Sequence, residues 1–227
     1  IGDRECITFS VDDDCADISA SDIELMESGC CRFTLHLFTD MSLESQVVNL
    51  AIPGRHSVSN ALAAAACAVA AGASIEQIVS GLEAAQSPAR RLQAKDLAQG
   101  GQIIDDSYNA SPESVRAAID VLAQSAKPRL LVLGDMGEVG TQGVAFHQEA
   151  VSYAQQQHIE HVLTLGELSL HTAQACSTAV HCQSMEELEQ RVDHLLPTLS
   201  TVLVKGSRFM RMERVVQALT GEAGGVH

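Results

Sequence analysis

Beyond about residue 88, short apolar runs alternate with segments in which apolar residues recur at helical spacing. The apolar runs predict strands over 102–105, 129–133, 161–165 and 201–204. The amphipathic segments predict helices over 112–124, 145–157, 168–176 (the weakest pattern), 185–195 and 209–219. Alternation of this kind predicts an α/β fold built of βαβ units, which is a Rossmann-like, open and mostly parallel sheet with helices on both faces.

The first part of the chain shows a different pattern. Strand-like runs come first and two helical segments follow, over 6–9, 32–38, 46–50, 60–71 and 75–85. The polar stretch 87–91 contains a proline and comes just after the second predicted helix, so we expect a domain boundary there. One domain would cover 1–88 and a second would cover 89–227.

Composition excludes several classes of function. The net charge of −15 and the 3% aromatic content argue against nucleic-acid binding and against docking on anionic membranes. The longest apolar run, 61–71, is too short to cross a bilayer, so no membrane insertion is expected. The seven cysteines show no Cys-x-x-Cys spacing, which predicts free thiols in a cytoplasmic protein, without a disulfide framework or a bound metal.

The polar stretch 105–113 lies between a predicted strand and a predicted helix. Ser111 is a natural N-cap, followed by proline at the first helical position. A ligand at such a junction meets free backbone N–H groups and the positive end of the helix dipole. The stretch therefore predicts a nucleotide contact. In the alternative interpretation, Asp105, Asp106 and Asn109 only close a tight turn.

Two further turns follow predicted strands. The first, 134–140, is rich in glycine, but its glycine spacing is not that of a dinucleotide-binding fingerprint. The second begins at Lys205, and Arg208, Arg211 and Arg214 then repeat every three residues along the predicted helix. This basic patch suits a carboxylate or a phosphate. The alternative is a solvated helix face that pairs with the acidic residues Glu213 and Glu222.

One motif in the first domain could also meet a nucleotide. Asn60 follows Gly54-Arg55-His56, and its side-chain amide could pair with both the donor and the acceptor edge of adenine. A helix-capping role for Asn60 is the alternative. The sequence contains no G-x-x-x-x-G-K-[ST] phosphate loop and no Gly-x-Ser-x-Gly nucleophile motif.

Taken together in order, these motifs resemble the later half of the Mur ligases. The resemblance covers about 47–219 and is carried by 54–64, 91–93, 105–112, 133–138 and 204–213. The loop Asp-Asp-Ser-Tyr-Asn-Ala and the turn Leu-Gly-Asp-Met-Gly-Glu are most similar to those of the members that add a terminal dipeptide. The resemblance implies the last part of a central α/β ATPase domain, followed by a C-terminal ligase domain.

The resemblance also implies roles for individual residues. Nucleotide binding is implied for His56, Asn60 (on adenine), Arg91 and Asp106 (on the ribose and phosphate side), and Asn109. Substrate binding is implied for Asp135, Glu138, Lys205, Ser207 and Arg208. The phosphate loop, the Mg²⁺ ligands and a carbamylated lysine would precede this chain, so no catalytic residue is assigned within it.

The implied reaction is ATP-dependent formation of an amide bond through an acyl phosphate, with ATP and Mg²⁺ required. The implied substrates are UDP-N-acetylmuramoyl-tripeptide and D-alanyl-D-alanine, and the expected protein is a cytoplasmic monomer. The 227 residues by themselves are expected to be inactive.

Four positions depart from the family pattern, namely Ser57, Arg90, Ser111 and Phe209. Arg90 stands where glycine is common, which leaves open whether Arg90 or Arg91 meets the nucleotide. Rival interpretations are another Mur ligase, a folylpolyglutamate synthase, or a nucleotide-binding module without catalysis. A dinucleotide-dependent oxidoreductase is disfavoured by the missing fingerprint.

Overall fold

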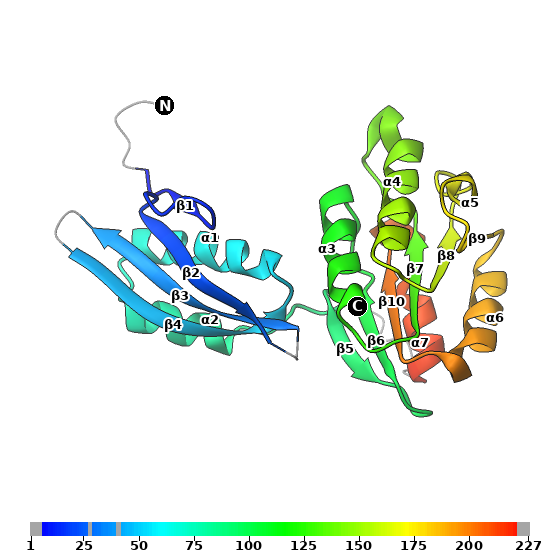
Figure 1. The fold of residues 1–227 in the computed structure, drawn as a ribbon, viewed down its shortest axis with the longest axis horizontal. Helices are drawn as coiled ribbons and strands as arrows, with labels where there is room; N and C mark the ends of the chain where they lie inside the picture. The colour runs from blue at the N-terminus through cyan, green and yellow to red at the C-terminus, as the bar shows by residue number, and fades with distance from the viewer. Residues whose placement is uncertain (1–5, 27–28, 40–41, 222–227) are drawn as a thin grey trace. The chain divides into compact units, whose positions relative to one another are not determined.

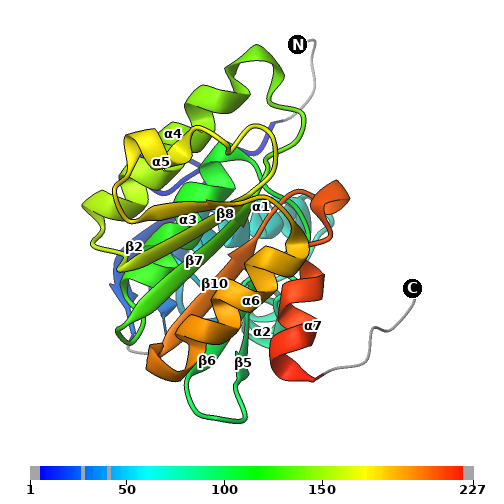
Figure 2. The ribbon, with the colours of Figure 1, turned by 90° about the vertical axis from the view of Figure 1, so that its right-hand side faces the viewer.

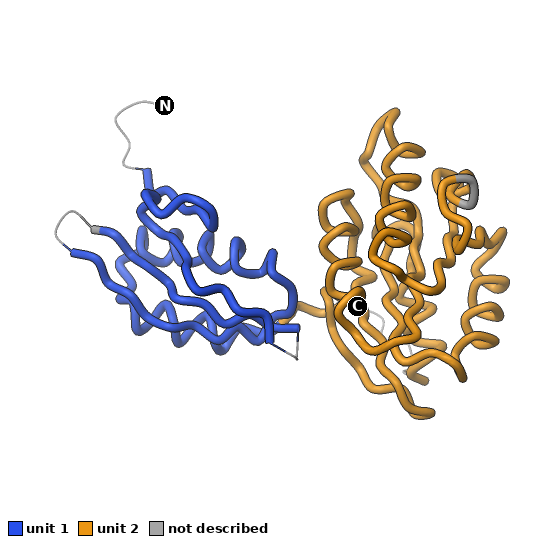
Figure 3. Tube along the Cα trace, viewed as in Figure 1, with its two compact units in different colours: residues 1–86 blue, residues 87–227 orange. Residues whose placement is uncertain are grey.

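The structure is a computed structural model that describes residues 6–26, 29–39 and 42–221. The chain divides into two compact units, Ile1–Gln86 and Ser87–His227 (Figure 3). The division falls at the start of the proline-bearing stretch 87–91. Each unit has its own hydrophobic core.

Unit 1 is a four-stranded sheet with two helices (Figure 1). In sheet order, its strands are β1 (Phe9–Ser10), β2 (Ile18–Leu25), β3 (Cys30–Thr39) and β4 (Ser42–Pro53). Strands β2, β3 and β4 are antiparallel, and β1 pairs parallel with β2. The helices are α1 (His56–Ala70) and α2 (Ile75–Ala84).

The core of unit 1 follows from the alternation in β3. Cys31, Phe33, Leu35 and Leu37 are buried and belong to one cluster with apolar residues of α1 and α2. Because successive side chains of a strand point to opposite faces, both helices cover the same face of the sheet.

Three predictions for unit 1 need correction. The strand predicted over 6–9 is reduced to Phe9–Ser10, and β2 was not predicted at all. The register of β2 shifts between Ser21 and Glu24, where Asp22 has a φ of 51°, and this bulge interrupts the alternation on which the prediction depended. Helix α1 begins at His56, so Asn60 lies inside it and its capping role is wrong.

Unit 2 is a six-stranded sheet in the order β5-β6-β10-β7-β8-β9 (Figure 2). The strands are β5 (Gln93–Asp96), β6 (Gln102–Asp106), β7 (Arg129–Gly134), β8 (His161–Leu165), β9 (Ala179–Cys182) and β10 (Thr201–Lys205). Only β5 is antiparallel to its neighbour. The helices are α3 (Pro112–Ala123), α4 (Gly143–Gln156), α5 (Thr172–Ala175), α6 (Met185–Leu195) and α7 (Glu213–Thr220), with 3₁₀ turns η1 (Gly140–Gln142), η2 (Leu196–Thr198) and η3 (Arg208–Met210).

Helices cover both faces of this sheet, as the sequence predicted. Strand β7 is buried along its whole length. Leu131 and Leu133 join the core formed with α3 and α4, whereas Leu130 and Val132 join the core formed with α6 and α7. The predicted Rossmann-like, mostly parallel sheet is therefore confirmed.

The predictions for unit 2 missed both edge strands and misplaced two helices. Strand β5 is polar and β9 is only four residues long, so neither has the apolar run of a central strand. The weak helix predicted over 168–176 is reduced to α5, and the helix predicted from 209 begins at Glu213. Arg211 has a φ of 50°, in the left-handed region, and this interrupts helical geometry between η3 and α7. In the described part of the chain, no helix has the length and hydropathy needed to cross a membrane.

Candidate functional site

The strand order of unit 2 brings three of the predicted loops to one edge of its sheet. Strand β10 lies between β6 and β7, so Lys205 is in register with Asp106 on one side and with Leu133 on the other. In open parallel sheets, ligands bind beyond the carboxyl ends of the strands. The loops that follow β6, β7 and β10 all begin at this edge.

Asp106 and Lys205 form a buried ion pair at the centre of the edge. The Lys205 ammonium lies 2.5 Å from Asp106 Oδ2 and also donates to the backbone oxygen of Asn109 at 3.0 Å. The other carboxylate oxygen of Asp106 accepts from the backbone N–H of Leu92 at 3.1 Å. Burial raises the pKa of Asp106 and lowers the pKa of Lys205, although each partner opposes the shift of the other.

The two adjacent aspartates therefore differ in role. Asp105 Oδ1 accepts hydrogen bonds from the backbone N–H and the hydroxyl of Ser107, at 3.1 and 2.6 Å. Asp105 thus closes the turn, as the alternative interpretation of this loop predicted. Asp106 does not close that turn, because its partners come from β10 and from the stretch before β5.

The neighbouring arginines Arg90 and Arg91 also differ. Arg90 has a φ of 62°, and its guanidinium lies 3.4 Å from Glu213 at the start of α7. The exposed guanidinium of Arg91 stacks over the ring of Tyr108, 4.8 Å from its centre. Arg91 therefore lies beside the loop that carries Asp106 and the exposed residue Asn109.

Asp135, at the end of β7, is buried and has backbone partners. Its carboxylate accepts from the N–H groups of Leu168 and Ser169, at 2.9 and 3.0 Å. Gly166, with a φ of 127°, permits this approach, because a Cβ atom there would lie 2.2 Å from Asp135 Cγ. Asp135 thus connects the loops after β7 and β8, and Glu138 in the same turn is exposed.

His147 fixes the turn after Asp135. Its Nε2 atom accepts from the backbone N–H of Met136 at 2.9 Å, so Nδ1 carries the proton that is donated to the oxygen of Gly143 at 2.7 Å. The carboxylate of Asp135 lies 3.5 Å from Nε2, but an Nε2 atom that accepts a hydrogen bond offers it no proton. Nothing in the sequence indicated a role for His147, because one of its partners, the backbone N–H of Met136, becomes its neighbour only when the turn after β7 packs against α4.

Ser207 connects three loops of the edge. Its hydroxyl accepts from the backbone N–H of Gly137 at 2.6 Å and donates to the oxygen of Ala110 at 3.2 Å. Its own N–H donates to the oxygen of Asp135 at 3.0 Å. Ser207 is 3% exposed, so the structure gives it a role in holding the loops together.

The predicted basic patch is not one continuous surface. Lys205 is 2% exposed, whereas the Arg208 side chain is 52% exposed and donates to Glu213 at 2.6 Å. Arg211 lies in the left-handed turn, and Arg214 is 3.8 Å from Glu186 on α6. The predicted repeat along one helix is wrong, because the helix begins after Arg211. Glu222 lies outside the described residues.

The remaining predicted residues lie in unit 1. His56 and Asn60 are exposed in the first turns of α1, where a separation of four residues places them on one side of the helix. Ser57 between them is buried, and its hydroxyl donates to the oxygen of Pro53 at 2.8 Å. Gly54, with a φ of 93°, makes the turn from β4 into this helix.

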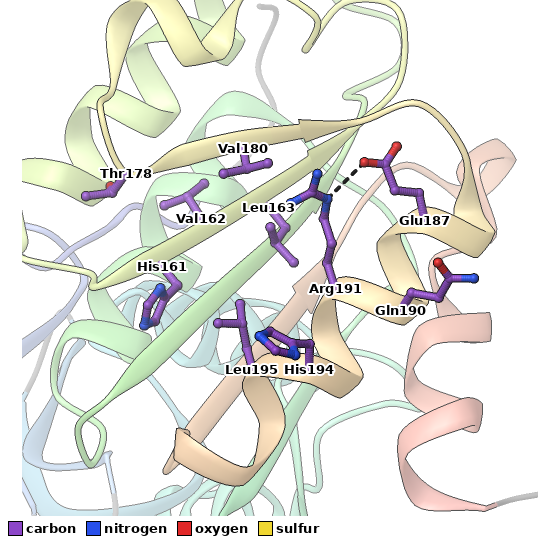
Figure 4. Close-up of a pocket in the computed structure, with 10 residues that line it drawn as sticks. All are labelled: His161, Val162, Leu163, Thr178, Val180, Glu187, Gln190, Arg191, His194 and Leu195. Carbon is purple, nitrogen blue, oxygen red and sulfur yellow. Dashed lines mark hydrogen bonds and ion pairs between the residues drawn. The ribbon is translucent and has the colours of Figure 1, made fainter.

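A groove of about 500 Å³ lies between α6 and strands β8 and β9 (Figure 4). It contains none of the predicted site residues and is lined by His161, Val162, Leu163, Thr178, Val180, Glu187, Gln190, Arg191, His194 and Leu195.

One group of three side chains in the described residues has metal-ligand spacing. It consists of Asp13, Asp14 and Cys15, all exposed in unit 1. A thiol is a soft ligand that Mg²⁺ does not prefer, so this group does not fit the implied metal.

Comparison with known proteins identifies the family. The family model "Mur ligase, glutamate ligase domain" matches residues 90–208, which is more than half of the chain. The chain belongs to the Mur ligase family. The matched region begins at Arg90 and ends at Arg208, and so includes the loops after β6 and β7 and the first residues of the loop after β10.

Individual Mur ligases are similar over almost the whole chain. The chain is 37% identical to the UDP-N-acetylmuramoyl-tripeptide--D-alanyl-D-alanine ligase of Escherichia coli (strain K12), over 96% of the chain and 48% of the relative. A MurF crystal structure from Acinetobacter baumannii matches with a TM-score of 0.81 and 32% identity, over 94% of this chain and 46% of that one. A MurF ligase from Thermotoga maritima in complex with ADP has the same fold, with a TM-score of 0.73 and 23% identity over 92% of this chain and 47% of that one.

The chain therefore spans about half the length of these Mur ligases. The family of the chain is established, while the roles predicted for individual residues stay predictions. The structure brings together Arg91, Asp106, Asn109, Lys205, Ser207 and Arg208 in unit 2, with Asp135 and Glu138 on the neighbouring loop.

Proposed function

We propose that this chain is part of an ATP-dependent ligase that joins D-alanyl-D-alanine to UDP-N-acetylmuramoyl-tripeptide in cytoplasmic peptidoglycan precursor synthesis. The observation that carries the proposal is the convergence of Arg91, Asp106 and Arg208 on the carboxyl edge of unit 2, in a chain 37% identical to a ligase of that name. ATP is the expected energy source. The metal-binding groups needed with ATP are not assigned to this chain.

The proposed reaction has two steps. An oxygen of the tripeptide carboxylate attacks the γ-phosphorus of ATP, which forms an acyl phosphate and releases ADP. The amine of D-alanyl-D-alanine then attacks the acyl carbon, loses a proton and displaces phosphate, which leaves the new amide bond. Residues of this chain would bind and orient ATP and D-alanyl-D-alanine.

Three groups at the edge each suit one part of this reaction. The Asp106 carboxylate can accept hydrogen bonds from ribose hydroxyls, because each carboxylate oxygen has a second lone pair beside the one already used. The exposed Arg91 guanidinium can meet a phosphate oxygen. The guanidinium of Arg208, whose side chain is half exposed, suits the carboxylate of the incoming dipeptide. In unit 1, Asn60 would contact adenine and His56 would lie near the nucleotide.

The test is D-alanyl-D-alanine-dependent phosphate release by the complete ligase that contains this chain. Arg91→Ala should raise the KM for ATP about tenfold, which corresponds to about 1.4 kcal/mol. Arg90→Ala is the matched control, because Arg90 is the adjacent arginine and its side chain is only 27% exposed, beside Glu213. A larger effect at Arg90 than at Arg91 would reverse the assignment, and an absence of dipeptide-dependent turnover would refute the function itself.

We also propose that the 227 residues alone neither hydrolyse ATP nor form the amide. No G-x-x-x-x-G-K-[ST] loop is present in this sequence to hold the phosphates. Titration calorimetry and a phosphate-release assay on the purified chain should show weak ATP binding and no turnover. Phosphate release that depends on D-alanyl-D-alanine would contradict this proposal.

A further inference from the structure

We propose that Lys205 is a positioning residue of the nucleotide subsite, that it acts through Asp106, and that it does not bind the incoming dipeptide. This inference rests on the proposed function and changes the role that the sequence predicted for Lys205. It follows from burial and from the partners of each side chain at the edge of unit 2.

The contacts of Lys205 point into the protein. The residue is 2% exposed, and its ammonium group donates to Asp106 Oδ2 and to the backbone oxygen of Asn109. Two of the three N–H donors of a lysine are therefore engaged, one at the end of β6 and one on the loop that follows it. A ligand arriving from solvent would have to displace Asp106 from a buried cation, and that displacement is unfavourable.

Asp106 needs this cation in order to act as an acceptor. Burial disfavours the ionised form of its carboxyl group, and the positive charge of Lys205 opposes that effect. Only the ionised form offers both oxygens as acceptors to ribose hydroxyls. Asp106 Oδ1 also holds the backbone N–H of Leu92, the residue after Arg91. Lys205 thus keeps Asp106 ionised. Through Asp106 it also holds the backbone of Leu92, and with it the adjacent residue Arg91, in position.

Arg208, three residues further on, has the opposite properties. Its side chain is 52% exposed, and its guanidinium donates to Glu213. A guanidinium has five N–H donors, so several of them can still meet a carboxylate. Burial thus separates the two cations of this turn into one that faces the Asp106 loop and one that faces solvent.

The experiment measures KM for ATP and for D-alanyl-D-alanine separately in the complete ligase. Lys205→Met keeps the length of the side chain without its charge, and we expect KM for ATP to rise about tenfold while KM for the dipeptide changes by less than about twofold. Arg208→Met should show the reverse. Arg191→Met, an exposed arginine on α6, serves as the control for loss of a positive charge.

A double-mutant cycle tests whether Lys205 acts through Asp106. Asp106→Asn should raise KM for ATP by a similar factor, and Lys205→Met/Asp106→Asn should be no worse than either single change. The double variant leaves no unpaired buried charge, so it remains informative if Lys205→Met does not fold. Lys205→Arg retains the cation and should restore most of the affinity for ATP.

Hydrogen exchange on the 227-residue chain gives a readout that needs no turnover. The Leu92 amide should exchange about tenfold faster in Lys205→Met than in Lys205→Arg, because its acceptor is no longer held. Equal exchange rates at Leu92 in the two variants would overturn the inference. So would a double variant in which the KM increases of the two single variants multiply. A raised KM for the dipeptide with an unchanged KM for ATP in Lys205→Met would also overturn it. An inactive wild-type ligase would instead refute the proposed function. Failure of the proposed function can therefore be distinguished from failure of the role inferred for Lys205.

Discussion

Gly166→Ala should destabilise unit 2 far more than an ordinary glycine substitution. The added Cβ atom would lie 2.2 Å from Asp135 Cγ and 2.4 Å from both carboxylate oxygens. Asp135 would have to move away from the N–H groups of Leu168 and Ser169. Each hydrogen bond to a charged group contributes about 1.5–3 kcal/mol, and the positive φ adds about 1–3 kcal/mol. The expected loss in unfolding free energy is therefore about 4 kcal/mol or more.

Gly100→Ala is the matched control within the same unit. Gly100 also has a positive φ, 93°, but an added Cβ atom there would meet nothing within 4 Å. Its substitution should cost only the backbone strain, about 1–3 kcal/mol. The difference between the two variants isolates the contribution of the Asp135 carboxylate.

The assay is urea unfolding monitored by hydrogen exchange of the buried amides of β7, which report on unit 2 alone. The chain contains no tryptophan, so intrinsic tryptophan fluorescence is not an option. In an Asp135→Ala background, Gly166→Ala should cost no more than Gly100→Ala, because the overlap is gone. Equal costs of Gly166→Ala in both backgrounds would refute the reasoning.

Two further predictions concern the helix cap and the thiols. Ser111→Ala should lower the unfolding free energy of unit 2 by about 1 kcal/mol in urea unfolding, because Ser111 accepts from Ser114 N at 3.3 Å, and Ser111→Asn should retain most of it. Iodoacetamide at pH 8 with mass spectrometry should label Cys15 and Cys67 but not buried Cys182, whose pKa is raised to about 11 by burial. The charges of Asp14 and Asp13 raise the pKa of Cys15, so the rate of its labelling should increase as the pH rises. Asp14→Asn removes one of these charges and should also increase the rate. Equal labelling rates in the wild type and in Asp14→Asn would contradict this prediction.

Much of the fold of unit 2 could be predicted because its signals are local. The apolar run at β7 is buried on both faces, and Ser111 caps α3 with Pro112 at its start, as predicted. Helical periodicity and capping depend on residues a few positions apart, so the sequence displays them directly. The short edge strands β5 and β9 lack such a signal. An edge strand pairs with only one neighbouring strand and buries few apolar side chains, so its sequence needs no long apolar run.

The candidate site was predictable in its location but not in its partnerships. Turns after strands indicated the carboxyl edge, and the motifs indicated the family. No local pattern, however, predicts that Asp106 pairs with Lys205, which is 99 residues away. Nor does any local pattern predict that the Asp135 carboxylate occupies the space that a side chain at Gly166 would need. The strand order decides which loop ends become neighbours, and burial then decides which charged side chains bond to each other and which face solvent. These properties arise only when the sheet is assembled, and they divide the basic turn between buried Lys205 and exposed Arg208.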